Sequence, residues 1–180
     1  MRYLLLITSA AALLTCSAYA SADIVNVSDA ASLTTAINNA QAGDEIVLAN
    51  GSYNLTGANC TAAGTATQPI IVRAAQPLGA TIAFDGLEGF KVSGAHWHFE
   101  DLDISGVCAD HNDCEHAFHV FGAAHGFWLR RSRVKDFNAQ LKVNVGTVNG
   151  TKVAPDDGLI EGCDIGDSQA RQTSAPVTKL

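Results

Sequence analysis

The chain has 180 residues, 47% of them hydrophobic, and this length predicts a single globular domain. Its 18 acidic and 11 basic residues give a net charge of −7, which argues against nucleic acid as a partner because phosphate binding needs positive charge. The N-terminal apolar run at residues 3–14 is too short to cross a bilayer, so we expect no membrane span.

Residues 1–22 have the features of an export signal. Arg2 supplies the positive start, the apolar run follows, and small-x-small sequences suitable for cleavage come next. We therefore predict a signal peptide over 1–22, one domain over 23–180, and a secreted or periplasmic protein.

The first part of the predicted domain combines a helix with short strands. Apolar residues recur at helical spacing within 28–40, and either Asp29 or Ser32 suits the helix N-cap. Residues 45–48 follow as a strand. The polar segment 54–67 is expected to be a loop.

Three segments of the chain, 96–106, 126–136 and 157–167, repeat at offsets of 30 and 31 residues. Two positions are apolar in all three, and two others read acid, base, acid. The apolar sets are Phe99/Leu129/Ile160 and Ile104/Val134/Ile165, and the charged sets are Glu100/Arg130/Glu161 and Asp103/Arg133/Asp164. A strand-like repeat of this length is typical of a stacked solenoid, in which each acid–arginine–acid column neutralises itself. We predict an all-β, right-handed parallel β-helix with one rung per repeat.

Further strands complete the predicted rungs. We expect them at residues 69–74, 80–84, 90–92, 96–104, 118–120, 127–134, 141–143 and 159–165, with an extra loop at 146–157. The short N-terminal helix would cover the first rung, whose backbone groups would otherwise be exposed. Residues 177–180 read as the start of another strand with no cap, so we expect a β-helix truncated at the C-terminus, the N-terminal part of a longer one.

Four cysteines follow the predicted signal. They are Cys60, Cys108, Cys114 and Cys163. In an oxidising compartment Cys108 and Cys114 can form a disulfide between rungs. The alternative is a metal site that also uses His111, His116 and His119, although structural zinc usually shows tighter paired spacing. Cys163 aligns with Leu102 and Ser132 and is expected to face the core as a small apolar residue.

Three basic side chains align on the middle strands. The triplets Phe-Lys-Val, Phe-His-Val and Leu-Lys-Val place Lys91, His119 and Lys142 at equivalent outward positions, in a column without an acid. Lys142 and His119 are candidate catalytic bases, and Lys91 is a candidate substrate ligand. The alternative is that all three are ordinary solvated residues on a β-face.

Other candidates for substrate binding are Trp128, Lys135 and Arg171. An outward Trp can hold a sugar ring. Among the clustered bases at 130–135, the arginines have acidic neighbours in adjacent rungs and read as structural pairs, which leaves Lys135 unpaired. Arg171 is a more distant candidate on a loop. Trp97 and Phe127 align and are expected in the core.

Several N-terminal motifs resemble the opening of a known group of β-helix proteins. They are Leu33-Thr34-Thr35-Ala36-Ile37, Ala42-Gly43-Asp44-Glu45-Ile46-Val47-Leu48, Gly51-Ser52-Tyr53, Pro69-Ile70-Ile71-Val72-Arg73-Ala74 and Ile82-Ala83-Phe84-Asp85-Gly86. Over roughly residues 30–106 the chain is similar to the chondroitinase-B-like and alginate-lyase-like proteins of polysaccharide lyase family six.

The resemblance implies β-elimination of an acidic, uronate-containing polysaccharide by a base assisted by positive charge. Lys142 is the nearest match to the family's catalytic lysine. The family's calcium is implied as well, but its glutamates are absent here, and only Asp136 and Asn138 precede Lys142 closely. Calcium ligands are therefore not identifiable.

The leading hypothesis is an exported, monomeric lyase. One alternative is a non-catalytic carbohydrate-binding or surface β-helix. Another is a pectin-type glycoside hydrolase that uses paired carboxylates such as Asp103 and Asp164, with Asp156 and Asp157 on a nearby loop.

Overall fold

The computed structural model describes residues 22–168. Most of the predicted signal peptide, Arg171 and the predicted strand at 177–180 lie outside the described residues. No helix in the described part is both long and apolar enough to cross a membrane.

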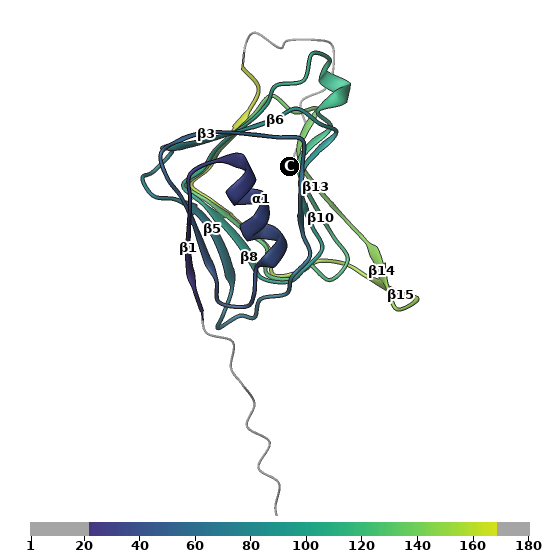
Figure 1. Cartoon of the computed structure of the whole chain (residues 1–180). Coiled ribbons are helices and arrows are strands. Elements are labelled where there is room, and N and C mark those ends of the chain that lie inside the picture. Colours follow the sequence, from purple (N-terminus) through teal and green to yellow (C-terminus); the bar gives the residue numbers. More distant parts are fainter. Residues whose placement is uncertain (1–21, 169–180) are drawn as a thin grey trace, which may run out of the picture.

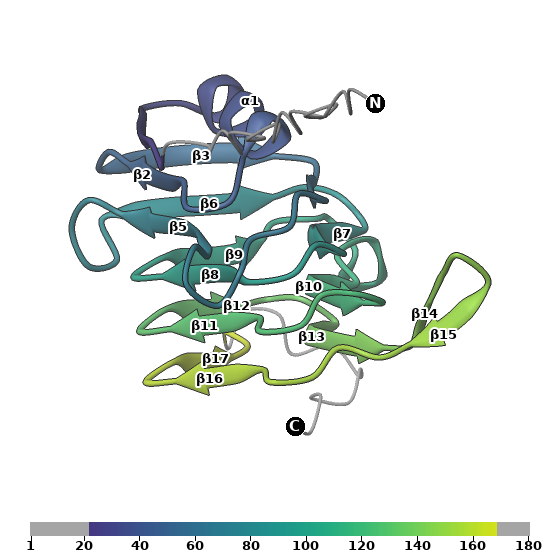
Figure 2. The same ribbon diagram turned by 90° about the horizontal axis from the view of Figure 1, so that it is seen from below.

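Three parallel sheets wrap into a coil, and successive rungs stack along its axis (Figures 1 and 2). The first sheet contains, in spatial order, β1 (Ile24–Val27), β2 (Glu45–Leu48), β5 (Ile70–Ala74), β8 (Trp97–Glu100), β11 (Trp128–Arg130) and β16 (Leu159–Glu161). The second contains β3 (Gly51–Leu55), β6 (Ala80–Phe84), β9 (Asp103–Gly106), β12 (Arg133–Lys135) and β17 (Asp164–Gly166). The third contains β4 (Ala58–Cys60), β7 (Glu88–Val92), β10 (His116–Phe121) and β13 (Ala139–Asn144). The parallel β-helix predicted from the repeats is therefore confirmed.

The register of the stacked strands is the one that the repeats predict. Leu129 pairs with Phe99 on one side and Ile160 on the other. Val134 pairs in the same way with Ile104 and Ile165. The apolar set predicts that Ile160 is buried like Phe99 and Leu129, and this is wrong, because Ile160 is 38% exposed. Ile160 lies on the last described rung, where no described strand stacks beyond it.

The prediction of one long strand in each repeat is wrong, because each repeat contains two strands separated by a bend. Asp101, Arg131 and Gly162 occupy the bends with φ of 61°, 47° and 64°. These left-handed conformations turn the chain from the first sheet to the second. The two charged columns therefore lie on different sheets.

Two predicted loops also contain strands. The segment 54–67 includes the end of β3 and all of β4, where Leu55, Ala58 and Cys60 are buried. Pairing with β6 and β7 supplies backbone hydrogen bonds that override the polar composition. The loop 146–157 contains the antiparallel hairpin of β14 (Gly146–Val148) and β15 (Thr151–Val153), which projects from the coil (Figure 2).

Helix α1 (Ala30–Asn39) lies across the opening of the coil, as predicted (Figure 1). The side chain of Asp29 accepts a hydrogen bond from the backbone N–H of Ser32, and Ser32 Oγ accepts one from the N–H of Asp29. Both candidate caps thus act together in a capping box. Leu33 and Ile37 are buried beneath the helix.

Aromatic side chains stack from rung to rung inside the coil. The rings of Phe90 and Phe118 are stacked 5.3 Å apart, and Phe99 meets Phe118 edge-on at 5.0 Å. Trp97 and Phe127 are buried, as predicted. This apolar interior fixes which side chains of each strand point outward.

The cysteines have the predicted arrangement. Cys108 and Cys114 form a disulfide, which removes both from the alternative metal site. The disulfide closes the loop that contains the short 3-10 helix at His111–Asp113 and leads to β10. Cys163 packs partly buried against the core, and Cys60 is buried, which raises the pKa of its thiol.

Candidate functional site

The outer face of the third sheet carries the predicted basic column. His119 pairs with Lys91 in the preceding rung and Lys142 in the following rung. Asn59 pairs with Lys91 and extends the column to the first rung. Because Phe90 and Phe118 fill the interior, their neighbours Lys91 and His119 point outward.

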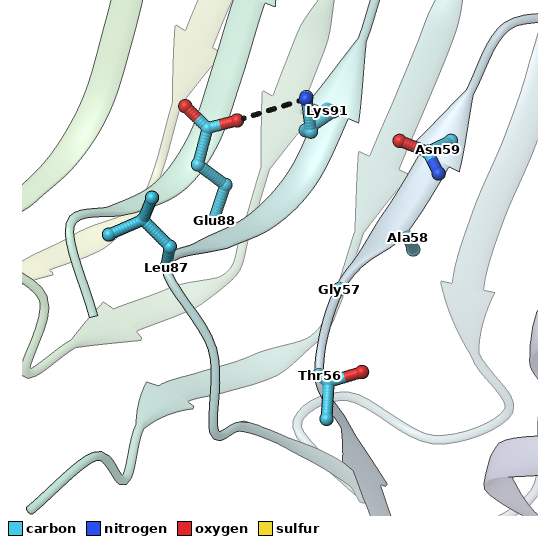
Figure 3. Close-up of a pocket in the computed structure, with 7 residues that line it drawn as sticks. All are labelled: Thr56, Gly57, Ala58, Asn59, Leu87, Glu88 and Lys91. Atoms are coloured by element: carbon cyan, nitrogen blue, oxygen red, sulfur yellow. Dashed lines mark ion pairs between the residues drawn. The ribbon is translucent and has the colours of Figure 1, made fainter. Parts of the chain in front are cut away.

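Glu88, at the start of β7, contacts two members of this column. Its Oε2 lies 3.5 Å from Lys91 Nζ, and its Oε1 lies 2.7 Å from His119 Nδ1. Figure 3 shows the Glu88 side chain directed toward Lys91. Burial raises the pKa of Glu88, but the charges and hydrogen bonds of His119 and Lys91 together bring it below its usual value. The column itself contains no acid, as predicted, but Glu88 reaches two of its members from a neighbouring position.

His119 is held on its other side by β13. Its Nε2 lies 2.6 Å from Asn144 Oδ1. The amide orientation of Asn144 is fixed because its Nδ2 donates to the carbonyl of Val145 at 2.9 Å. Nε2–H of His119 is thus the donor to Asn144. The imidazole is positioned between two rungs and does not move freely in solvent.

Two further side chains, Glu115 and His116, lie beside Glu88 at one end of the third sheet. His116 is 8% exposed, and its Nδ1 lies 3.7 Å from Glu88 Oε1 and 3.5 Å from Glu115 Oε2. Burial lowers the pKa of His116, and the nearby charge of Lys142 lowers it further. The sequence named His116 as a possible metal ligand but did not indicate Glu88 or Glu115 beside it, although Glu88 and His116 each precede the aligned apolar–basic–Val triplets by two residues.

A pocket of about 360 Å³ opens beside the column, between β4 and β7 (Figure 3). It is lined by Thr56, Gly57, Ala58, Asn59, Leu87, Glu88 and Lys91. Gly57 has φ of 155°, and a Cβ there would lie 2.9 Å from the carbonyl oxygen of Glu88. Glycine therefore permits the close approach of the two strands that form this pocket.

The other predicted binding residues lie on different sheets. Trp128 belongs to the first sheet, and its ring stacks on His98 at 3.9 Å with an interplanar angle of 7°. Arg130 Cζ lies 5.5 Å from the centre of the same ring. Lys135 belongs to the second sheet and lies 3.3 Å from Asp164, so the expectation that Lys135 is unpaired is wrong. The structure does not bring Trp128 or Lys135 to Lys142.

The arginines at 130–133 form the structural pairs that the sequence predicts. Each has acidic partners within 4.0 Å: Arg130 with Glu161 and Glu100, Arg131 with Asp101 and Glu100, and Arg133 with Asp103 and Asp164. Hydrogen bonds to Asp101 and Glu100 raise the pKa of Arg131. This surface neutralises itself and does not form a basic patch.

Comparison with known sequences identifies the family. The sequence profile of chondroitinase B matches residues 27–117. The chain belongs to the chondroitinase B family. The match ends before Lys142, so the alignment of Lys142 with a catalytic lysine still depends on the register of the third sheet. Among curated proteins, none matches the chain significantly.

Solved structures of polysaccharide lyases share the fold of this chondroitinase B family member. An alginate lyase from Paenibacillus sp. str. FPU-7 superimposes with a TM-score of 0.64 at 21% identity, covering 78% of this chain and 43% of that one. The family 6 alginate lyase AlyGC superimposes with a TM-score of 0.53 at 18% identity, covering 66% of this chain and 17% of that one. A mannuronic acid specific family 6 lyase from human gut microbiota superimposes with a TM-score of 0.52 at 20% identity, covering 76% of this chain and 30% of that one. The chain thus spans less than half the length of these proteins, and identities this low establish the fold alone.

The residues before Lys142 do not fit the calcium site that the family resemblance implies. Calcium takes six to eight oxygen ligands, usually from several carboxylates. Here Asp136 and Asn138 stand where the family has glutamates, and Asp136 Oδ1 already accepts a hydrogen bond from the N–H of Ser168 at 2.6 Å. Asp136 and Asn138 therefore do not form a calcium site of the kind that the resemblance implies.

Proposed function

We propose that this chain binds acidic, uronate-containing polysaccharide on the outer face of the third sheet and cleaves it by β-elimination. The observation that carries the proposal is the column of Lys91, His119 and Lys142 on one face of a protein whose net charge is −7. Stacked strands lie about 4.8 Å apart, so this column presents regularly spaced basic side chains to an anionic chain. Family membership supports the same substrate class.

Lys142 is the candidate base. In β-elimination a base removes the proton next to the uronate carboxylate, and nearby cations stabilise the anion that develops. Lys91 is paired with Glu88, and His119 is held by Glu88 and Asn144. Within residues 22–168, by contrast, no carboxylate lies within ion-pair distance of Lys142. Lys142 is thus the member of the column whose amine is not already engaged by a carboxylate of the described residues, which suits it to this role.

We also propose that the protein is exported, with a signal peptide over 1–22 and a β-helix domain over 23–180. The Cys108–Cys114 disulfide supports this location, because such bonds persist in oxidising compartments.

The proposed activity is tested by offering alginate, polygalacturonate and chondroitin or dermatan sulfate to the purified chain. Elimination creates an unsaturated product, whose formation is followed by its ultraviolet absorbance. Hydrolysis creates no such unsaturated product. We expect Lys142→Ala to lower kcat at least about 100-fold, the lower end of the usual contribution of a general base. Lys152→Ala, on the projecting hairpin, is the matched control and should leave the rate unchanged. Equal rates for Lys142→Ala and the unmodified chain would show that Lys142 is an ordinary surface lysine.

A second candidate function is carbohydrate binding without cleavage. It is favoured by Glu88, which contacts both Lys91 and His119 and so already engages two of the three basic side chains of the column. If no glycan yields an unsaturated product, a Lys91→Ala/Lys142→Ala double variant should still lose glycan affinity in titration calorimetry. The hydrolase alternative gains no support, because Asp103 and Asp164 are both paired with Arg133.

A further inference from the structure

Three side chains at one end of the third sheet are arranged around a common point. The Nδ1 atom of His116 and one carboxylate oxygen each from Glu88 and Glu115 all lie within 4.8 Å of one another. The distances from Nδ1 to the two oxygens, 3.7 and 3.5 Å, are too long for hydrogen bonds. They approach the separation of about 3.3 Å expected between ligand atoms that surround one zinc ion at about 2 Å in tetrahedral geometry.

The Nδ1 atom of His116 is buried without a hydrogen-bond partner among the described residues. His116 is 8% exposed, and its unpaired nitrogen faces the carboxylates of Glu88 and Glu115. A buried polar atom left unpaired is costly, and native proteins satisfy nearly all of them. A cation bound between the three side chains would satisfy this nitrogen and offset the repulsion between the two acids.

The backbone holds these three residues on adjacent rungs. Glu88 and His116 are direct partners in the parallel pairing of β7 with β10. The N–H groups of Glu115 and His116 both donate to the carbonyl of Leu87, at 2.8 and 3.2 Å. Cys114, which precedes Glu115, is fixed by its disulfide to Cys108. The side chains therefore project from backbone that needs no rearrangement to bind an ion.

We propose that Glu88, Glu115 and His116 form a binding site for a divalent transition-metal cation, with zinc as the best fit. One imidazole nitrogen and two carboxylates are ligands that zinc accepts readily, whereas calcium prefers six or more oxygens. Three protein ligands also leave a coordination position open. Lys91 and His119 contact the Glu88 carboxylate and would hold it in place. The site lies one rung before the strand where the family resemblance places calcium ligands.

The test measures binding of Zn²⁺ to the metal-free chain by competition with a chromophoric chelator, without any polysaccharide. Its result is therefore independent of the proposed lyase activity. We expect one Zn²⁺ per chain, and each of His116→Ala, Glu88→Gln and Glu115→Gln should weaken binding at least about tenfold. His125→Ala is the matched control, because His125 also pairs with a carboxylate, Asp156, but lies elsewhere. It should leave the affinity unchanged.

Cobalt provides a second readout, since Co²⁺ bound at this site should give visible absorption bands that His116→Ala abolishes. Glu115→Gln keeps the side-chain shape at a position whose side chain is 43% exposed, so this variant should fold, as circular dichroism would check. The proposal is overturned if Zn²⁺ does not bind, or if binding survives all three substitutions. It is also overturned if Ca²⁺ competes equally with Zn²⁺ for the site.

Discussion

His98 shows how burial sets the chemistry of a single residue. The side chain lies on the first sheet with 6% of its surface exposed, and its ring stacks on Trp128. Burial is the main cause that lowers its pKa from 6.5 to about 4. The imidazole is therefore neutral at physiological pH, and its charged form opposes folding.

This depressed pKa predicts how stability depends on pH. Between pH 6.5 and 4 the unfolded chain binds a proton at His98 that the folded chain does not, so the stabilisation present above pH 6.5 is lost as pH falls toward 4. The loss from this group is at most about 3 kcal/mol. It is measured by urea denaturation across this pH range.

His98→Phe is the control for the pH experiment. Phenylalanine keeps an aromatic ring against Trp128 but does not titrate. The variant should show a shallower decline in unfolding free energy between pH 6.5 and 4. An identical decline in both proteins would assign the effect to other groups.

The charged columns determine how neighbouring strands of the coil are matched. Arg133 lies 3.1 Å from Asp103 and 3.6 Å from Asp164, one rung to either side. In an adjacent sheet Arg130 occupies the same position between Glu100 and Glu161. Each arginine removes the repulsion that would arise between stacked acids.

Arg133→Glu should lower the unfolding free energy by about 1–2 kcal/mol at low salt, because three acids would then stack on successive rungs. Arg133→Ala should cost less, since it removes the ion pairs without adding repulsion. At about 1 M salt the difference between the two variants should shrink, because charges are screened within about 3 Å. Equal stability of Arg133→Glu and the unmodified chain at low salt would contradict the stacking.

The molecule as a whole is a stack whose last described rung is uncovered. Leu129 and Ile160 occupy the same column, yet Leu129 is 1% exposed and Ile160 is 38% exposed. Helix α1 covers the opposite end of the stack (Figure 2). The contribution of a given apolar residue thus depends on whether rungs lie on both sides of it.

This difference predicts unequal costs for equivalent truncations. Leu129→Ala should lower the unfolding free energy by about 2–5 kcal/mol, the usual range for a buried leucine. Ile160→Ala should cost less than about half of that, because much of its side chain already contacts water. Urea denaturation of both variants measures the difference. Equal losses would show that Ile160 is as well covered in solution as Leu129.

Several features of the fold and the site could be predicted from the sequence. In a parallel coil, residues one repeat apart become direct neighbours, so a period of 30 or 31 residues fixes the columns through Leu129, Arg130 and Arg133. The same reasoning aligned Lys91, His119 and Lys142. The helix cap at Asp29 or Ser32 and the possible Cys108–Cys114 disulfide are local features, and short spacing was enough to indicate them, although only the structure showed that both cap residues act together.

Other features depended on the tertiary structure. The bends at Asp101 and Arg131 divide each repeat between two sheets, and backbone conformation at such residues is set by packing more than by residue type. Glu88 and His116 stack directly, but the reach of Glu88 to His119 and its approach to Glu115 are diagonal contacts between rungs. Periodicity specifies which residues stack directly, because strand spacing is constant. It does not specify diagonal contacts, because these depend on side-chain conformation and on how the sheet bends.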